Sequence, residues 1–324
     1  MSFVTPKQIR HAMIMKRVQE HYDEALQYFP EEQIVGVFLQ GSQNYELDNA
    51  GSDVDTKLII VPSFKDICLN KKPVSTTHVR ANDEHTDWKD IRLYMETFRK
   101  QNLNFLEILF TDFYIINPMY KEEWDRLVAA REFIARMNVY RAVKSMKGIA
   151  MEKFHAMEHR YPTKVDIIDK YGYDGKQVSH LIRVYDYLRR YIAGEPYKAC
   201  LIPSSTLRKE IMDYKMLDVY DLATARGAAT YYLQLVTELA DAFCAKHSDQ
   251  EEGWVRELLE DVSYNIMRIF VEKELLKSDP NYPKVDMYDE SVPGGIRWAH
   301  QPATEKYPHG GWFEDLSNLR KEPE

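Results

Sequence analysis

The apolar residues of this chain change their spacing near Met95. Before that point, short runs with the length and β-branched content of strands stand between turn-rich segments, at residues 34–40, 54–61, 74–80 and 88–94. After it, apolar residues recur with a helical period to about Lys277. We therefore predict an α+β fold, in which a small mixed β-sheet domain is followed by an all-α helical domain.

The predicted domain boundaries follow this change in spacing. Residues 1–118 are expected to hold the sheet and an N-terminal helix, which begins with the capping-box sequence Thr5-Pro6-Lys7-Gln8. Residues 119–278 are expected to form the helical domain. Residues 279–324 are rich in Pro, Gly and aromatic residues without a clear period, which predicts an irregular tail that wraps over the body.

Net charge and cysteine content limit the class of protein. The net charge of −8 argues against a protein that binds nucleic acid over its whole surface, although it allows a local basic groove. The three cysteines lie far apart and make no metal-binding pair, as expected in a reducing compartment. No stretch has the length and apolarity of a membrane span or of a secretory signal, so we expect a cytoplasmic protein with no membrane partner.

Asp53 and Asp55 stand two residues apart where the second predicted strand begins. On a strand, side chains at i and i+2 point to the same face, a few ångströms apart. Two carboxylates so placed repel each other unless a cation neutralises them, and a hard divalent cation with oxygen ligands is the usual partner. Taken alone, the pair fits a solvent-exposed strand edge better than a metal site.

Gly41-Ser42, at the end of the first predicted strand, changes this interpretation. A strand that ends in Gly-Ser and opens a turn or helix exposes backbone N–H groups and a hydroxyl, and glycine lets a phosphate approach closely. A phosphate-binding turn followed by two carboxylates on the next strand predicts a site for a nucleoside triphosphate with Mg²⁺ or Mn²⁺. Tyr45, just after the turn, would either stack on the base or pack in the core.

The spacing Gly-Ser-x10-Asp-Val-Asp resembles the signature of the DNA polymerase β-like nucleotidyltransferase superfamily. Within it, the bacterial and phage-type predicted nucleotidyltransferases are similar to three stretches of this chain, GSQNYELDNAGSDVDTKLIIVPSFKD, KDIRLYMETFRKQNLNFLEILF and GYDGKQVSHLIRVYDYLRRY. The resemblance covers residues 34–275 and leaves out the N-terminal helix and the tail. It implies an enzyme that transfers NMP, expected to be AMP, from an NTP, expected to be ATP, to a hydroxyl and releases pyrophosphate.

The resemblance also implies a third carboxylate on a neighbouring strand. Asp90 is the first choice for it, and Asp87 is the alternative. Asp53, Asp55 and Asp90 would then hold two metal ions, which activate the acceptor hydroxyl and align it for attack on the α-phosphorus. Asp90 would also be a candidate general base.

The helix expected at residues 175–192, with Asp174 as its N-cap, carries a polar and largely basic stripe. Its members recur at i, i+4, i+7, i+11 and i+14, and they are Lys176, His180, Arg183, Tyr187 and Arg190. Because a helix N-terminus and cations act together on phosphate, Lys176 is expected to contact the triphosphate, with His180 and Arg183 nearby. Tyr187 and Arg190 are expected on a solvated helix face.

Two other functions stay open at this point. The acceptor is expected to be an RNA, a protein or a small molecule, but it would be another nucleotide if the enzyme made an oligonucleotide second messenger. Alternatively, the chain would be a nucleotide-binding module without activity. The sequence has no Walker loop and no glycine fingerprint for dinucleotides, which argues against the kinase and dehydrogenase classes that depend on these motifs.

Overall fold

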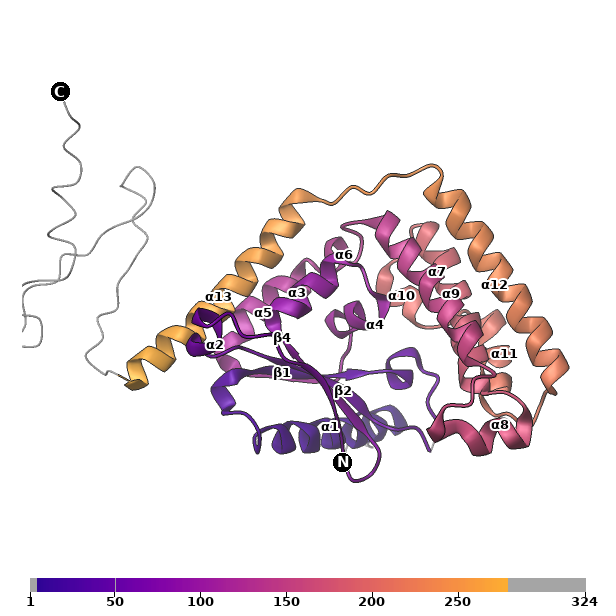
Figure 1. The fold of residues 1–324 in the computed structure, drawn as a ribbon, viewed down its shortest axis with the longest axis horizontal. Helices are drawn as coiled ribbons and strands as arrows, with labels where there is room; N and C mark the ends of the chain where they lie inside the picture. Colours follow the sequence, from indigo (N-terminus) through magenta and orange to yellow (C-terminus); the bar gives the residue numbers. More distant parts are fainter. Residues whose placement is uncertain (1–4, 50, 279–324) are drawn as a thin grey trace, which may run out of the picture. The chain divides into compact units, whose positions relative to one another are not determined.

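The computed structural model describes residues 5–49 and 51–278, and the predicted tail at 279–324 lies outside the described residues. Residues 1–271 group into one compact unit and residues 272–324 into another. The first unit combines a five-stranded mixed sheet with many helices, in agreement with the predicted α+β class (Figure 1). Its further division at residue 118 stays a prediction.

The sheet has the strand order β3-β4-β2-β1-β5. Its strands are β1 Ile34–Gln40, β2 Asp55–Ile60, β3 Ser75–Val79, β4 His85–Asp90 and β5 Tyr114–Ile116. β2 and β4 run parallel, whereas the other neighbours are antiparallel. The runs predicted at 34–40, 54–61 and 74–80 are therefore confirmed as strands, while β5 is a strand that the sequence pattern did not predict.

The fourth predicted strand, at 88–94, is wrong in its position. β4 ends at Asp90, and α3 (Ile91–Arg99) begins at the next residue. The reason is local, because the Asp90 carboxylate accepts a hydrogen bond from the Arg92 N–H (2.9 Å) and so caps the helix. The alternating pattern of WKDIRLY thus joins the end of a strand to the first turn of a helix.

α1 (Pro6–Ala25) lies against one face of the sheet (Figure 1). Its capping box is confirmed, since Thr5 Oγ1 accepts the Gln8 N–H (3.3 Å) and Gln8 Oε1 accepts the Thr5 N–H (2.8 Å). Val18 on the inner side of α1 is fully buried and belongs to the same apolar cluster as Leu39 of β1. The N-terminal helix is therefore a packed part of the sheet unit.

Helices cover the opposite face of the sheet and extend beyond it (Figure 1). Besides α1 and α3, the described α-helices are α2 Phe64–Cys68, α4 Leu103–Leu106, α5 Lys121–Ala129, α6 Arg131–Ile134, α7 Val139–Ala156, α8 Val165–Tyr171, α9 Gly175–Ile192, α10 Tyr197–Leu201, α11 Ser205–Lys215, α12 Leu222–Cys244 and α13 Gly253–Ser278. α9 contacts α7, α11 and α12, and its bounds agree with the predicted helix at 175–192. It is the central helix of this layer.

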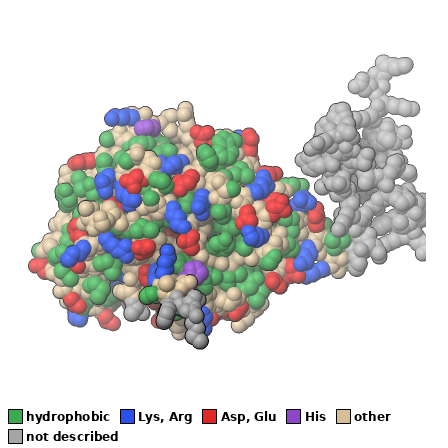
Figure 2. All heavy atoms as spheres, turned by 180° about the vertical axis from the view of Figure 1, so that it is seen from behind, with side chains coloured by type: hydrophobic (Ala, Val, Ile, Leu, Met, Phe, Trp, Pro, Cys, Tyr) green, Lys and Arg blue, Asp and Glu red, His purple; other side chains and the backbone are tan. Residues whose placement is uncertain are grey.

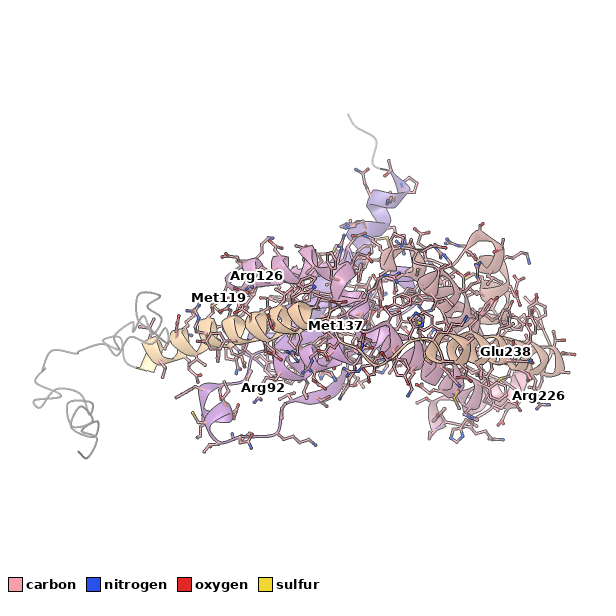
Figure 3. All side chains as sticks on the ribbon, turned by 90° about the horizontal axis from the view of Figure 1, so that it is seen from above. Arg92, Met119, Arg126, Met137, Arg226 and Glu238 are labelled. Atoms are coloured by element: carbon pink, nitrogen blue, oxygen red, sulfur yellow. The ribbon has the colours of Figure 1, made fainter. Side chains whose placement is uncertain are left out.

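One apolar core joins the sheet to the helices. Phe38 of β1, Phe98 of α3 and Leu181 of α9 are fully buried members of it. Polar contacts add to this packing at α13, where Arg126 of α5 lies beside the helix (Figure 3) and pairs with Asp261 (2.6 Å). The sheet and the helices that follow it are therefore continuous in their packing.

The surface carries charges of both signs. On the face shown in Figure 2, Lys and Arg side chains are interspersed with Asp and Glu side chains. This face therefore lacks the extended basic area that general nucleic-acid binding uses. Among the described residues, no helix combines the length and the apolarity needed to cross a membrane.

Candidate functional site

Gly41 and Ser42 leave β1 through a sharp turn. Gly41 has a φ of +95°, a left-handed conformation that favours glycine, and a Cβ at this position would meet no atom within 4 Å. The residues that follow form a short 3₁₀ helix, Ser42–Tyr45. The Gly41 N–H donates to Oε1 of Glu107 (3.3 Å), a buried carboxylate that the sequence pattern did not single out. The turn is thus open where a Cβ would project, and the hydrogen bond to Glu107 fixes its backbone.

Asp53 and Asp55 lie beside this turn. Asp55 is the first residue of β2 and pairs in register with Gln40, the last residue of β1. Asp53 precedes the strand and is exposed, so only one of the two carboxylates belongs to the strand itself. The Gln43 side-chain amide donates to the Asp53 carbonyl oxygen (2.6 Å), which links the turn to the acidic pair. Antiparallel pairing therefore brings the two motifs to one corner of the sheet.

The two carboxylates of this pair have different surroundings. Oδ1 of Asp55 accepts a hydrogen bond from the His85 N–H (2.9 Å), and the Asp55 side chain is 30% exposed. The Asp53 carboxylate makes no hydrogen bond or ion pair with any described residue. Carboxylate oxygens are the ligands that Mg²⁺ and Mn²⁺ prefer, so the pair fits such an ion if phosphate and water complete its shell. No three Asp, Glu, His or Cys side chains of the described ranges are arranged to share a metal ion.

The third carboxylate at this corner is Asp87, and Asp90 does not join the group. In the parallel β2–β4 pair, Asp87 is in register with Lys57, which lies on the Asp55 side of β2. Asp90 comes three residues later on the opposite side of the strand, where it is buried and accepts hydrogen bonds from the Arg92 guanidinium (3.0 and 2.7 Å). Asp90 thus serves as the cap of α3, and its choice over Asp87 as the third carboxylate stays a prediction that this placement does not favour.

Lys57 is a site residue that the sequence reasoning missed. Its side chain is 2% exposed, and its Nζ lies 3.2 Å from Oδ2 of Asp87 and 4.1 Å from the centre of the Phe105 ring. Thr77 Oγ1 also donates to Asp87 (2.7 Å). Burial raises the pKa of Asp87, but the Lys57 charge and the hydrogen bonds outweigh this effect and leave that pKa below its usual value. The sequence did contain a signal for Lys57, because it stands two residues after Asp55 and therefore on the same face of the strand.

A group of cations gathers around the first turns of α9. Lys176 is exposed at the start of the helix, where its N–H donates to the capping Asp174 carboxylate (3.0 Å). His180 lies one turn further, and its pKa is held well below the usual value, first by burial and then by the charges of Arg183, Lys176, Lys153 and Lys215. Lys153 on α7 and Lys215 on α11 were not predicted, because helical spacing within one segment cannot reveal cations that other helices contribute.

Lys215 connects this cationic group to Asp53 of the acidic pair. Burial lowers its pKa and the charge of Lys176 lowers it further, whereas Asp48 and Asp53 act in the opposite sense. Its Nζ donates to the Leu47 carbonyl oxygen (2.5 Å), in the loop that leads from the Gly-Ser turn to Asp53. The start of α9 and the acidic corner of the sheet are therefore within electrostatic reach of each other.

Arg183 is buried rather than presented on an open stripe. It is 3% exposed, and its guanidinium carbon lies 3.9 Å from the centre of the Tyr45 ring. Its Nε and Nη1 have no hydrogen-bond partner among the described residues. The Tyr45 hydroxyl donates to Glu107, a carboxyl whose pKa is raised by burial. Of the two roles expected for Tyr45, the structure shows core packing, in a buried group behind the Gly-Ser turn.

The far end of the stripe differs from the solvated face that the sequence suggested. Tyr187 is fully buried, because neighbouring helices surround α9 on this side as well. Arg190 is partly buried, and it donates to the Ile202 carbonyl oxygen (2.7 Å) and to Glu195 (2.7 Å). The expectation of a solvated face is thus wrong for Tyr187, and both residues have structural roles.

A separate hollow lies at the C-terminal end of α9. It has a volume of about 510 Å³ and is lined by Glu132, Phe133, Arg136, Gly194, Pro196, Glu252 and Trp254. None of the predicted site residues lines it. The candidate site is therefore the acidic corner of the sheet together with the cations at the opposite end of α9.

Comparison with known proteins does not assign the chain to a family. No protein-family model matches it, and no curated protein matches it either. The resemblance to nucleotidyltransferases therefore depends on the sequence motifs alone.

Proposed function

We propose that this protein is a metal-dependent nucleotidyltransferase, which moves NMP from an NTP to a hydroxyl acceptor and releases pyrophosphate. One observation carries the proposal: β1–β2 pairing brings Gly41-Ser42 beside Asp53 and Asp55, with Lys215 within electrostatic reach of Asp53. A triphosphate with its metal ion needs carboxylates for the ion and cations for the phosphates. ATP is the expected donor.

The cations around α9 would bind the phosphate groups. Without a ligand, Lys176, Lys215 and their neighbours repel one another, and this repulsion contributes to the lowered pKa values of His180 and Lys215. A bound polyanion would relieve this repulsion, and the relief would favour its binding. The same cations would stabilise the charge that develops on the leaving pyrophosphate.

Asp53 and Asp55 would bind the metal ion, and Asp87 would position a neighbouring side chain. When bound at Asp53 and Asp55, Mg²⁺ or Mn²⁺ would neutralise phosphate oxygens and lower the pKa of the acceptor hydroxyl. Asp87 takes the place of Asp90 in this proposal. Because its lowered pKa makes it a weak base, its task would be to hold the Lys57 ammonium beside Asp55.

A nucleotide-binding module without activity is the second candidate. Asp87 already has Lys57, Thr77 and Gln40 as partners, at 3.2, 2.7 and 3.4 Å, so its oxygens are less available to a second metal ion. A site with two rather than three available carboxylates would still bind a nucleotide with one metal ion. Only the nucleotidyltransferase would release pyrophosphate repeatedly, so a measurement of turnover separates the two candidate functions.

The test is transfer of label from α-labelled ATP, and then from the other NTPs, with Mg²⁺. Purified protein would be incubated alone and with cell extract, and wild type would be compared with Asp55→Ala. A matched control is Asp241→Ala, which removes an exposed carboxylate of α12 that pairs with Lys147 (2.6 Å). We expect label on an RNA, protein or small-molecule fraction with wild type and with the control, and none with Asp55→Ala.

Other outcomes point to the alternatives. Labelled products formed from nucleotides alone would identify an oligonucleotide synthase. Nucleotide binding without pyrophosphate release, whatever the acceptor, would support the inactive module. Equal labelling by wild type and Asp55→Ala would contradict the proposal.

A further inference from the structure

A buried polar network lies beneath the acidic pair, between α1 and the sheet. Its centre is Glu84, the residue before β4, whose side chain is fully buried. Oε1 of Glu84 accepts a hydrogen bond from the Val54 N–H (2.8 Å). Val54 stands between Asp53 and Asp55, so this carboxylate holds the piece of backbone that carries both acidic side chains.

Several donors fix the Glu84 carboxylate in one position. Its Oε2 accepts hydrogen bonds from Asn82 Nδ2 (2.8 Å) and from Arg80 Nη1 (3.0 Å), and Arg17 of α1 forms an ion pair with it. A carboxylate is costly to remove from water unless such partners compensate for the lost hydration. With partners on both oxygens, Glu84 has little freedom to turn away from Val54.

His21 of α1 extends the network to both parallel strands. Its Nε2 lies 3.2 Å from Oε2 of Glu84, and its Nδ1 lies 2.8 Å from both Thr56 Oγ1 and Thr86 Oγ1. An ionised carboxylate only accepts hydrogen bonds, so the proton of a neutral His21 belongs on Nε2 and Nδ1 accepts from a threonine hydroxyl. Thr56 directly follows Asp55, and α1 is thereby connected to the strand that begins with this residue.

His85, the residue after Glu84, also contacts the acidic pair. Its N–H donates to Oδ1 of Asp55 (2.9 Å). Glu84 therefore fixes the backbone between the two acidic residues, and His85 fixes the carboxylate of one of them. We infer that Glu84 is a positioning residue, which sets the geometry of Asp53 and Asp55 for a divalent cation and makes α1 part of the site's support. The inference rests on the proposed function, because it assumes that the pair binds such an ion.

A purely structural role for Glu84 makes a different prediction. If Glu84 only stabilises the fold, its replacement lowers stability and leaves the affinity of the correctly folded protein for a cation unchanged. If it positions the acidic pair, the affinity falls as well, since groups that orient metal ligands typically account for about 10- to 100-fold in affinity. Cation affinity therefore separates the two roles.

The experiment titrates the full chain with Mn²⁺ alone and measures the dissociation constant by calorimetry, at a temperature at which each variant is folded. Glu84→Asp keeps the charge but shortens the side chain by one methylene, so that it no longer reaches Val54. Glu84→Gln keeps the reach but loses the charge. Asp186→Asn is the matched control, because Asp186 is an equally buried carboxylate of α9 that accepts the Ser204 N–H (2.8 Å) and pairs with Arg189 (3.0 Å).

We expect Glu84→Asp to weaken Mn²⁺ binding about tenfold, Glu84→Gln to weaken it less, and Asp186→Asn to leave it unchanged. Binding by Glu84→Asp within twofold of wild type overturns the inference, and so does a larger loss in Glu84→Gln than in Glu84→Asp. If neither Glu84 variant folds, Thr86→Val is measured instead. It removes one hydroxyl that hydrogen-bonds to His21, and an unchanged Mn²⁺ affinity overturns the inference.

Asp55→Ala separates this inference from the proposed function. If wild type binds Mn²⁺ no better than Asp55→Ala, the proposed metal site fails and the inference fails with it. If wild type binds and Asp55→Ala does not, while Glu84→Asp behaves as wild type, only the inference fails.

Discussion

The two sides of the candidate site differ in how firmly they are held. On the acidic side, Glu84 and His85 fix the backbone and one carboxylate of residues 53–55 through hydrogen bonds of 2.8 and 2.9 Å. On the basic side, Lys176 is exposed, and the cations near it come from several helices and repel one another. We infer that the side proposed to bind the metal ion is formed in advance, whereas the side proposed to bind phosphate gains stability only when an anion binds.

The acidic side gives the largest expected effect. Asp53→Ala and Asp55→Ala should each lower nucleotidyl transfer about a thousandfold, since several kcal/mol of charge stabilisation by the metal ion is lost. Only Asp55→Ala should also lower the free energy of unfolding, by about 1 kcal/mol, because it removes the acceptor of the His85 N–H. Rates with labelled ATP and urea denaturation check the two effects. Activity that survives in either variant would contradict the assignment.

Lys57→Met tests the buried ion pair beside the acidic residues. The substitution leaves the partly buried Asp87 without its cation, and we expect the free energy of unfolding to fall by about 2 kcal/mol. The double variant Lys57→Met/Asp87→Leu should recover part of this loss, because no unpaired charge remains. Denaturation at pH 7 measures both. If the double variant is no more stable than the single one, Lys57 acts through its packing on Phe105 instead.

The dependence of stability on pH tests the network beneath the acidic pair. Burial first, and then the charge of Arg80, lower the pKa of His21 to about 4. The unfolded chain therefore takes up this proton at a higher pH than the folded protein, and stability falls as the pH drops from about 6.5 to about 4. The full shift corresponds to about 3 kcal/mol. Carboxylates also titrate in this range, so the measurement compares wild type with His21→Gln.

The difference between the two proteins isolates the His21 contribution. We expect the stability advantage of wild type over His21→Gln to shrink between pH 7 and pH 4.5. A constant difference over this interval would show that His21 does not titrate in the way its burial implies.

Local signals in the sequence predicted local structure well. The capping box at Thr5 and the cap at Asp174 both mark helix starts, and the helix expected at 175–192 agrees with α9. These features depend on hydrogen bonds and apolar contacts within a few residues, which the sequence displays directly. The strand predicted at 88–94 was wrong at its end, because the capping of α3 by Asp90 was mistaken for a continuing strand.

Contacts between distant segments could not be predicted in the same way. Asp87 and Lys57 meet through the parallel β2–β4 register, and Glu84 meets Val54 across 30 residues. The cations around His180 come from three helices, so no single periodic stripe contains them. The motif identified the corner of the sheet, whereas the groups that support and complete it depend on tertiary packing.

Lys215→Met tests the basic side and gives the smallest expected effect. The ammonium of Lys215 is partly buried among like charges, which lowers its pKa, and so its removal should change the free energy of unfolding by less than about 1 kcal/mol. ATP affinity should nevertheless fall about tenfold, and its dependence on salt should weaken, because one contact to the triphosphate is lost. Lys209→Met is the matched control on α11, since Lys209 is exposed and pairs with Asp213 (2.5 Å). Equal ATP affinity of the two variants would remove Lys215 from the site. A large loss of stability in Lys215→Met would show that the basic side is as firmly built as the acidic one.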